Sequence, residues 1–185
     1  MSTKQIEKST VEIQIPDDVK VNLKGSMLHV QGPLGNVYKN FKKIPVLIEI
    51  NDNKILLKKT GERKKHLAIL NTSKSLIQTL CAGVVDGFTI KMKIVYSHFP
   101  ITVKVEGKNV LIENFQGERA PRISAIKGAT KVTVKGDDVI ITGPVLTDVS
   151  QTAANIQLKS KVKNKDHRVF LDGIYKFSQS KGIEK

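Results

Sequence analysis

The 185-residue chain is strongly basic, with 31 Lys and Arg residues against 17 Asp and Glu residues and a net charge of +14. Such a charge attracts polyanions, of which nucleic acids are the commonest. The single cysteine, Cys81, excludes an internal disulfide and a cysteine-based zinc site, and no apolar run reaches the roughly 18 residues that a membrane-spanning helix needs. The polar start MSTKQIEKST does not resemble a secretory signal, so we expect a cytoplasmic protein.

The first part of the chain alternates apolar and polar residues with the period of a β-strand. The alternation predicts strands at 11–15, 19–23, 28–30, 46–50 and 55–57. Gly25 predicts a hairpin turn between two of them, because glycine accepts the positive φ of a tight turn. The sequence GPLG at 32–35 predicts the next turn.

Between about Arg63 and Val85 the apolar period changes to that of a helix. Apolar residues recur there at spacings of three, four and seven, at Leu67, Leu70, Ile77, Leu80, Cys81 and Val84. This spacing predicts an amphipathic helix with one buried face. Cys81 lies on that face, which favours a buried structural thiol over a reactive one.

The second part of the chain repeats this plan. Residues 19–35 align with 101–117 at an offset of 82, and residues 48–57 align with 132–141 at an offset of 84. Strands are expected near 89–96, 101–105, 109–114, 119–125, 130–135 and 138–142, and a helix is expected from about 147 to 162. Asp148 and Gln151 resemble a capping box at the start of that helix.

Strands followed by a single helix, in each half of the chain, predict an α+β fold. We expect two tandem similar lobes, residues 1–86 and 87–185, each an antiparallel sheet packed against one α-helix. The two lobes share the basic excess, with 16 basic and 8 acidic residues in 1–100 and 15 and 9 in 101–185. A duplicated basic scaffold is typical of a binding protein.

The lobes differ after their helices, because only the second continues into a basic segment. The segment sets five basic residues against the single acid Asp166, and its members are Lys159, Lys161, Lys163, Lys165 and Arg168. The aromatic residues Phe170, Tyr175 and Phe177 follow. Lys and Arg neutralise phosphates, and structured RNA is recognised largely through its shape and backbone. A purely solubilising surface is the alternative interpretation.

Motifs of catalysis are missing from the sequence. The GPLG turn has neither the further glycines of a dinucleotide loop nor the Lys-Ser/Thr of a phosphate-binding loop. The histidines, at 29, 66, 98 and 167, do not have the spacing of a metal site, although His167 could contact phosphate among the lysines. Acidic residues lie mostly in turns, and no GxSxG motif is present. We therefore predict no enzyme, no cofactor and no metal site.

Several long blocks resemble the family of large-subunit ribosomal protein L6. They are residues 61–101, residues 112–122 with the sequence IENFQGERAPR, and residues 148–177, which contain KNKDHRVFLDGIYKF. The chain lacks the Tyr-Lys-Gly-Lys-Gly ending of the bacterial form. The block KNKDHRVFLDGIYKF is closer to the eukaryotic cytosolic form, known as protein nine in the older eukaryotic numbering, with the archaeal form as the alternative.

The resemblance implies a non-catalytic structural protein of the large ribosomal subunit. It implies binding to large-subunit ribosomal RNA near the base of the acidic stalk and the sarcin–ricin loop, with neighbouring ribosomal proteins as further partners. The RNA-facing residues that it implies are Arg119, Arg122, Lys159, Lys161, Lys163, Lys165, Arg168, Tyr175 and Lys176. A free-standing RNA- or DNA-binding regulator that uses the same basic segment is the alternative function.

Overall fold

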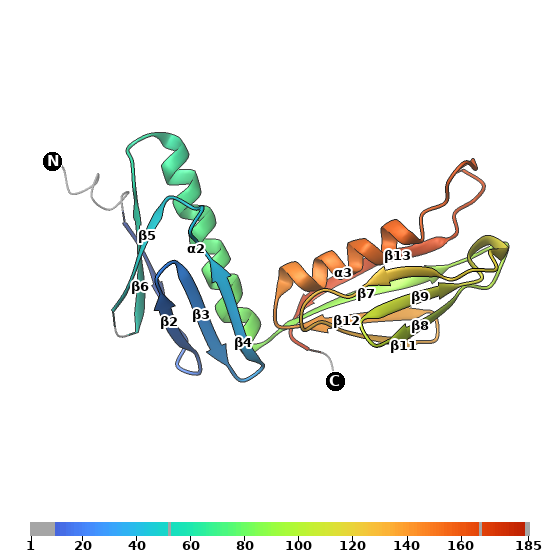
Figure 1. Cartoon of the computed structure of the whole chain (residues 1–185), viewed down its shortest axis with the longest axis horizontal. Helices are drawn as coiled ribbons and strands as arrows, with labels where there is room; N and C mark the ends of the chain where they lie inside the picture. The colour runs from blue at the N-terminus through green and yellow to red at the C-terminus, as the bar shows by residue number, and fades with distance from the viewer. Residues whose placement is uncertain (1–9, 52, 167, 184–185) are drawn as a thin grey trace. The chain divides into compact units, whose positions relative to one another are not determined.

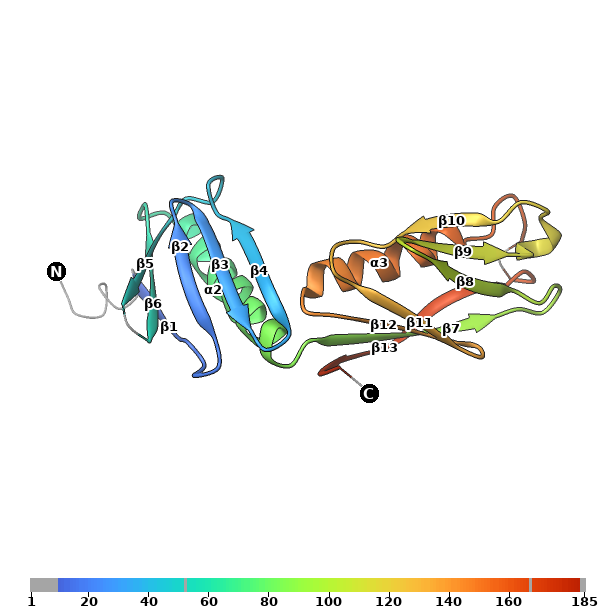
Figure 2. The same cartoon turned by 60° about the horizontal axis from the view of Figure 1, so that its bottom comes forward.

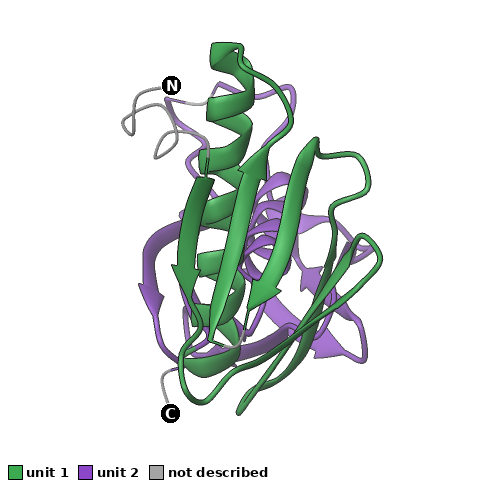
Figure 3. Cartoon of the chain, turned by 90° about the vertical axis from the view of Figure 1, so that its left-hand side faces the viewer, with its two compact units in different colours: residues 1–86 green, residues 87–185 purple. Residues whose placement is uncertain are grey.

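The computed structural model describes residues 10–51, 53–166 and 168–183. The chain divides into two compact units, residues 1–86 and 87–185, which are coloured separately in Figure 3. Each unit combines antiparallel strands with one α-helix, which confirms the predicted α+β fold with two similar halves. In the described part of the chain, neither helix is long and apolar enough to cross a membrane.

The described residues of unit 1 form six strands and one long helix (Figure 1). They are β1 (Thr10–Gln14), β2 (Lys20–Lys24), β3 (Met27–Gly32), β4 (Gly35–Asn40), β5 (Val46–Asn51), β6 (Lys54–Lys59) and α2 (Lys64–Val85). The strands form two three-stranded antiparallel sheets, with the orders β1-β6-β5 and β2-β3-β4. Helix α2 packs against both sheets and closes the core of this unit.

The predicted apolar stripe of α2 is its buried face. Leu70, Ile77 and Val84 have no exposed surface, and they lie with the fully buried Leu28 and Ile55 of the two sheets. The prediction for Cys81 on this stripe is confirmed: the thiol is free and buried, and burial raises its pKa because the thiolate would lose its hydration.

The GPLG turn is fixed to the end of α2. The backbone N–H of Leu34 donates to the carbonyl of Val84 at 2.9 Å, and a Cβ atom at Gly32 would lie only 2.7 Å from the Val84 side chain. Glycine is therefore required here by the close approach of helix and turn. The strand that follows, β4, was not predicted, because Val37 is its only fully buried apolar residue.

Unit 2, as far as the structure describes it, contains seven strands, one short 3-10 helix and one α-helix. They are β7 (Phe88–Val95), β8 (Thr102–Glu106), β9 (Asn109–Glu113), η1 (Phe115–Gly117), β10 (Arg122–Ala125), β11 (Lys131–Lys135), β12 (Asp138–Gly143), α3 (Leu146–Lys159) and β13 (Gly173–Lys181). The strand orders are β10-β9-β8 in one sheet and β11-β12-β7-β13 in the other. Helix α3 lies between them, as Figure 2 shows.

The internal repeat of the sequence reappears in the pairing of the strands. The hairpin β2-β3 corresponds to β8-β9, and both hairpins turn at a glycine with positive φ, +61° at Gly25 and +57° at Gly107. The hairpin β5-β6 corresponds to β11-β12, and β1 beside β6 corresponds to β7 beside β12. Strand β13 extends this sheet in unit 2 by pairing with the other edge of β7, and no described strand of unit 1 corresponds to it.

Three sequence-based predictions in unit 2 were wrong: the capping box of the helix, the residue at which the helix ends, and the residue at which one strand begins. The capping box is not formed: the N-cap of α3 is Val145, Asp148 lies in the first turn, and the side chain of Gln151 bonds Asn155. The helix ends at Lys159 instead of 162, because the chain beyond it extends to bury Val162.

The strand expected near 119–125 begins only at Arg122. Before it, Asn114 and Gln116 have positive φ angles of 56° and 52°, so the chain bends through η1 before it can pair again with β9.

Candidate nucleic-acid interface

The basic segment between α3 and β13 is held at both ends, and residues 160–172 are called the basic loop below. At its start, the buried Ser160 hydroxyl donates to the carbonyl of Gln157 at 3.2 Å and accepts the backbone N–H of Ile174 at 3.0 Å. Val162 is 3% exposed and joins the core. The first residues of the loop are therefore attached to both the helix and the strand that it connects.

Arg122 of β10 attaches the same stretch to the neighbouring sheet. One of its terminal nitrogens donates to the carbonyls of Lys159 and Lys161, at 2.8 and 3.1 Å. Its other nitrogens hold the carboxylate of Glu118, and its guanidinium lies 4.1 Å from the ring centre of Phe115. The hydrogen bond from Arg122 lowers the pKa of Glu118. A rigid planar donor group suits this arrangement, because it bonds several acceptors at once.

Asp172 fixes the other end of the loop. Its carboxylate is 2% exposed and accepts the backbone N–H of Ser97 at 2.5 Å, while its second oxygen lies 2.9 Å from Nδ1 of His98. Burial acts to raise the pKa of Asp172, but these hydrogen bonds outweigh it, and the pKa lies below its ordinary value. The centres of the His98 and Phe170 rings lie 4.5 Å apart, and the two rings are stacked. The ammonium group of Lys165 lies 5.0 Å from the centre of the Phe170 ring.

These attachments leave the predicted lysines on the surface. Lys161, Lys163 and Lys165 are exposed, on either side of the buried Val162. Arg119 is exposed in the turn before β10, three residues from Arg122. The structure thus brings Arg119, Arg122, Lys159, Lys161 and Lys163 together where β10 meets the end of α3.

Arg168, Tyr175 and Lys176 lie apart from that group. Arg168 is 90% exposed and pairs with Asp166 at 3.0 Å. Tyr175 and Lys176 belong to β13, where the Tyr175 hydroxyl donates to the carbonyl of Leu171 and Lys176 donates to Gln179. His167, which could contact phosphate, lies outside the described residues.

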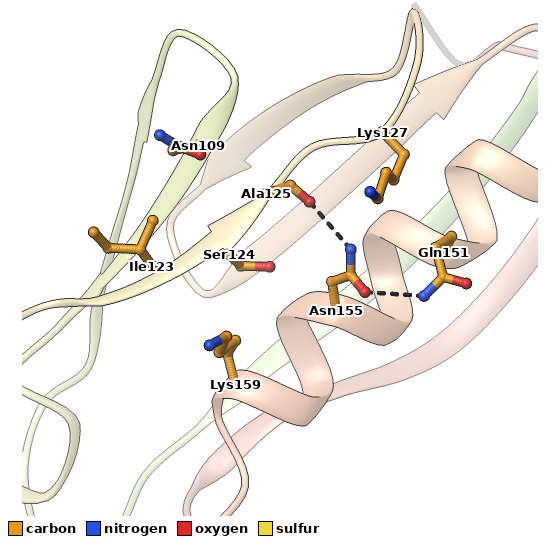
Figure 4. A pocket seen from close by; sticks show the side chains of 8 residues that line it. All are labelled: Asn109, Ile123, Ser124, Ala125, Lys127, Gln151, Asn155 and Lys159. Atoms are coloured by element: carbon orange, nitrogen blue, oxygen red, sulfur yellow. Dashed lines mark hydrogen bonds between the residues drawn. The ribbon is translucent and has the colours of Figure 1, made fainter.

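A groove between β10 and α3 continues the basic surface (Figure 4). Asn155 crosses it, donating to the carbonyl of Ala125 at 3.2 Å and accepting from Gln151 at 2.9 Å. Lys127 and Lys159 lie on either side of Asn155 along the groove. Ammonium and amide groups are donors that bind phosphate and ribose oxygens.

The sequence did not point to this groove. Lys127 and Asn155 are 28 positions apart, and the resemblance of residues 148–177 to a known family did not mark Asn155 as a contact. The backbone N–H of Lys127 donates to the hydroxyl of Thr152 on α3, which holds the two elements together. Two exposed aromatic residues near the loop, Tyr96 and Phe99, were also missed, because their strand-like run predicts only a β-strand.

Comparison with known proteins decides the family. A family model described as Ribosomal protein L6 matches residues 99–173. The large ribosomal subunit protein uL6 of Methanosarcina mazei is 44% identical over 163 residues, which cover 88% of this chain and 93% of that protein. The corresponding proteins of Archaeoglobus fulgidus and Methanosphaera stadtmanae are 41% and 47% identical, and cover 94% and 88% of this chain and 90% and 89% of their own lengths.

This chain belongs to the uL6 family of ribosomal proteins. Membership confirms the prediction of a ribosomal protein rather than an enzyme. The similarity to the relatives extends over both units, since their alignments span about nine-tenths of the chain. The family model matches only part of unit 2. That part contains all elements from β8 to α3, including η1, and the basic loop.

Proposed function

We propose that this protein is a structural constituent of the large ribosomal subunit and binds large-subunit ribosomal RNA chiefly through unit 2. The observation that carries the proposal is the basic loop, which is attached to the fold at Ser160, Arg122 and Asp172 while its lysines stay exposed. Because both ends of the loop are attached to the fold before binding, less backbone entropy is lost when its lysines meet phosphates. The groove with Lys127 and Lys159 adds donors beside it.

The expected RNA site lies near the base of the acidic stalk and the sarcin–ricin loop. Support for it comes from the resemblance of residues 148–177 to the family, and from the exposure of the basic side chains in this segment. The side chains that we propose to contact the RNA are Arg119, Lys159, Lys161, Lys163, Lys165, Arg168, Tyr175 and Lys176. Arg122 is assigned a positioning role, since four of its five N–H groups already have partners in the protein.

The subtype is part of the proposal. The sequence block at 163–177 favours the eukaryotic cytosolic form, while the relatives reported above are archaeal and favour the alternative. A cytoplasmic location follows from either form. A phylogenetic tree that includes eukaryotic and archaeal members decides between them by the branch on which this chain falls.

Sedimentation tests the proposed function. The protein is expected to co-sediment with large subunits in a gradient at moderate salt and to be released at high salt. Charge reversal at Lys161, Lys163 and Arg168 is expected to reduce incorporation more than charge reversal at Lys20, Lys24 and Lys39 of unit 1. Equal losses from the two triple variants would refute the assignment to unit 2.

Sedimentation together with crosslinking distinguishes this function from that of a free-standing RNA- or DNA-binding regulator. Such a protein remains in the ribosome-free fraction, and crosslinking followed by sequencing recovers messages or promoter DNA in place of one ribosomal site. Recovery of a single region of large-subunit RNA supports the structural role.

A further inference from the structure

In the described part of unit 2, one face of the four-stranded sheet is covered, and the other is exposed except near Thr89, which is buried and donates to the carbonyl of Gly182. Helix α3 and the sheet β8–β10 lie on the same side of it (Figure 2). Inward-facing residues of its two central strands, among them Ile90, Met92, Val139 and Ile141, have no exposed surface. Because side chains alternate along a strand, the residues between them face away from α3. These residues form what is called the outer face below.

Lysines dominate the outer face. Its charged positions, identified by the register of the strands, are Lys91, Lys93, Lys131, Lys135 and one acid, Asp138. Asp138 pairs with Lys93 at 3.1 Å. Within the described residues no ion pair is recorded for Lys131 or Lys135, and both are exposed on the edge strand β11. Among the described residues, the outer face therefore carries an excess of lysines, of which Lys131 and Lys135 carry the argument below.

The equivalent face of unit 1 is neutral among its described residues, although its strands pair in the same way. The sheet β1-β6-β5 directs Glu12, Glu49, Lys54 and Lys58 outward. These four residues form two ion pairs, Lys54 with Glu12 at 3.0 Å and Lys58 with Glu49 at 2.8 Å. The basic character of the outer face is thus a property of unit 2 and not of the shared fold.

The outer face also offers an aromatic ring and hydroxyl groups. By its register Tyr175 belongs to this face and not to the basic loop: it lies opposite Lys93 and is 42% exposed, and Ser178 lies opposite Lys91. The Tyr175 ring folds over Gly173, where a Cβ atom would lie 2.9 Å from the ring. Thr133 is exposed at the centre of β11. Exposed tyrosine rings stack on unpaired bases, and hydroxyls donate to phosphate oxygens.

We infer that the outer face is a second RNA-binding surface, which contacts the backbone of an RNA segment different from the one bound at the basic loop. The inference rests on the proposed function and extends it. The basic loop leaves α3 and contributes Val162 to the core on the covered side, whereas the outer face lies on the other side of the sheet. Lys131 and Lys135 are about 13 Å apart along β11, so they reach different phosphates of one strand. Unit 2 would then join two RNA segments.

Tethered hydroxyl-radical probing tests the inference in assembled large subunits. The chain's own cysteine, Cys81, is buried with a raised pKa, so a new surface cysteine is labelled selectively. An iron chelate is attached to the variant Thr133→Cys on the outer face, and in a separate sample to Lys161→Cys on the basic loop. We expect each probe to cleave ribosomal RNA, at different segments.

The two probes separate the failure of the inference from the failure of the proposed function. Cleavage from Lys161→Cys with none from Thr133→Cys overturns the inference and leaves the proposed function standing, and it is the result expected if a protein covers the outer face. Cleavage of one shared segment by both probes also overturns it. Absence of cleavage from both probes, in subunits that contain the labelled protein, contradicts both proposals.

A salt titration supplies a second readout with a matched control. Binding of the full chain to bare large-subunit RNA is measured for Lys131→Gln with Lys135→Gln, and for Lys54→Gln with Lys58→Gln on the equivalent sheet of unit 1. Each lost phosphate contact lowers the slope of log K against log salt by about 0.7–0.9. We expect this decrease for the first pair and an unchanged slope for the second. Equal slopes in the two double variants would overturn the inference.

Discussion

The two units share one plan of strand pairing and differ in what has been added to it. In unit 1, the described residues leave one edge of β1 without a neighbouring strand, whereas in unit 2 the corresponding edge of β7 pairs with β13. The chain that leads to β13 is the basic loop. The addition therefore extends a sheet and displays a row of lysines in the same stretch of sequence.

The charges of the two units differ in arrangement more than in number. Residues 1–100 and 101–185 carry similar excesses of basic residues. On the equivalent sheets, however, the lysines of unit 1 are paired with glutamates, and Lys131 and Lys135 of unit 2 have no recorded ion pair within the described residues. Net charge alone therefore does not predict where a nucleic-acid surface lies, and our proposal of such a surface rests on the pairing of each charge.

The largest effects are expected from the two helices. Ile156→Ala in α3 and Ile77→Ala in α2 each remove a side chain with no exposed surface, which costs about 2–5 kcal/mol of unfolding free energy. If the units unfold separately, each variant shifts its own transition in a denaturant titration followed by hydrogen exchange. A shift of both transitions by either variant would show that the units unfold together.

The next effect concerns the attachment that only unit 2 possesses. Asp172→Ala removes the acceptor of the Ser97 N–H and the partner of His98, and is expected to cost about 2–3 kcal/mol. Amide exchange should rise in the basic loop, and the exchange of α2 serves as the internal control. Unchanged exchange in residues 160–172 would mean that other contacts suffice to order the loop.

Asp172 also predicts a pH dependence. Its pKa is lower in the folded protein than in the unfolded chain, so its contribution is present above the ordinary aspartate pKa of about 3.9 and is lost as the pH falls through the folded value. Asp172→Asn, measured by thermal unfolding from pH 7 to pH 2.5, should lose less stability below pH 4 than the wild-type protein. Parallel curves for the two proteins would contradict the prediction.

A smaller effect is expected from Arg122→Lys. Lysine keeps the charge but cannot bond Glu118 and the carbonyls of Lys159 and Lys161 together, and the expected cost is about 1–2 kcal/mol. RNA affinity should fall because the lysines are less well positioned, while the slope of log K against log salt stays the same. A reduced slope would indicate that Arg122 contacts a phosphate directly.

The smallest effect is expected at the paired surface charges of unit 1. Lys54 and Glu12 are both more than half exposed, and such pairs contribute about 0.2–1 kcal/mol. Lys54→Gln should therefore leave the thermal midpoint of unit 1 within a few degrees of the wild-type value. A large decrease would show that the pair has a structural role that its exposure does not suggest.

Local patterns made part of the fold predictable. The stripe of Leu70, Ile77 and Val84 predicts α2 because burial follows the helical period, and Gly25 and Gly107 mark equivalent turns because both need positive φ. Strand β13 was not predicted. Its residues are mostly exposed, so it has no alternating apolar pattern, and its position depends on pairing with β7.

Part of the candidate site was also predictable from the sequence, and part was not. Composition and spacing identified the lysines from 159 to 165, since clustered charge is visible in a sequence; their contacts with RNA stay a prediction. The attachment of the loop was not visible, because Asp172 and Ser97 are 75 positions apart, and Arg122 meets Lys161 across 39. Contacts at such separations leave no periodic signal.

By itself, the sequence determined the duplication, the α+β class, the buried helix faces and the basic excess, because each of these follows from local periodicity or composition. Only the tertiary structure decided which lysines are paired, which edge of β7 receives β13, and which face of the four-stranded sheet stays open. These features depend on side chains that meet across long stretches of chain, where the outcome is set by packing and not by the order of neighbouring residues.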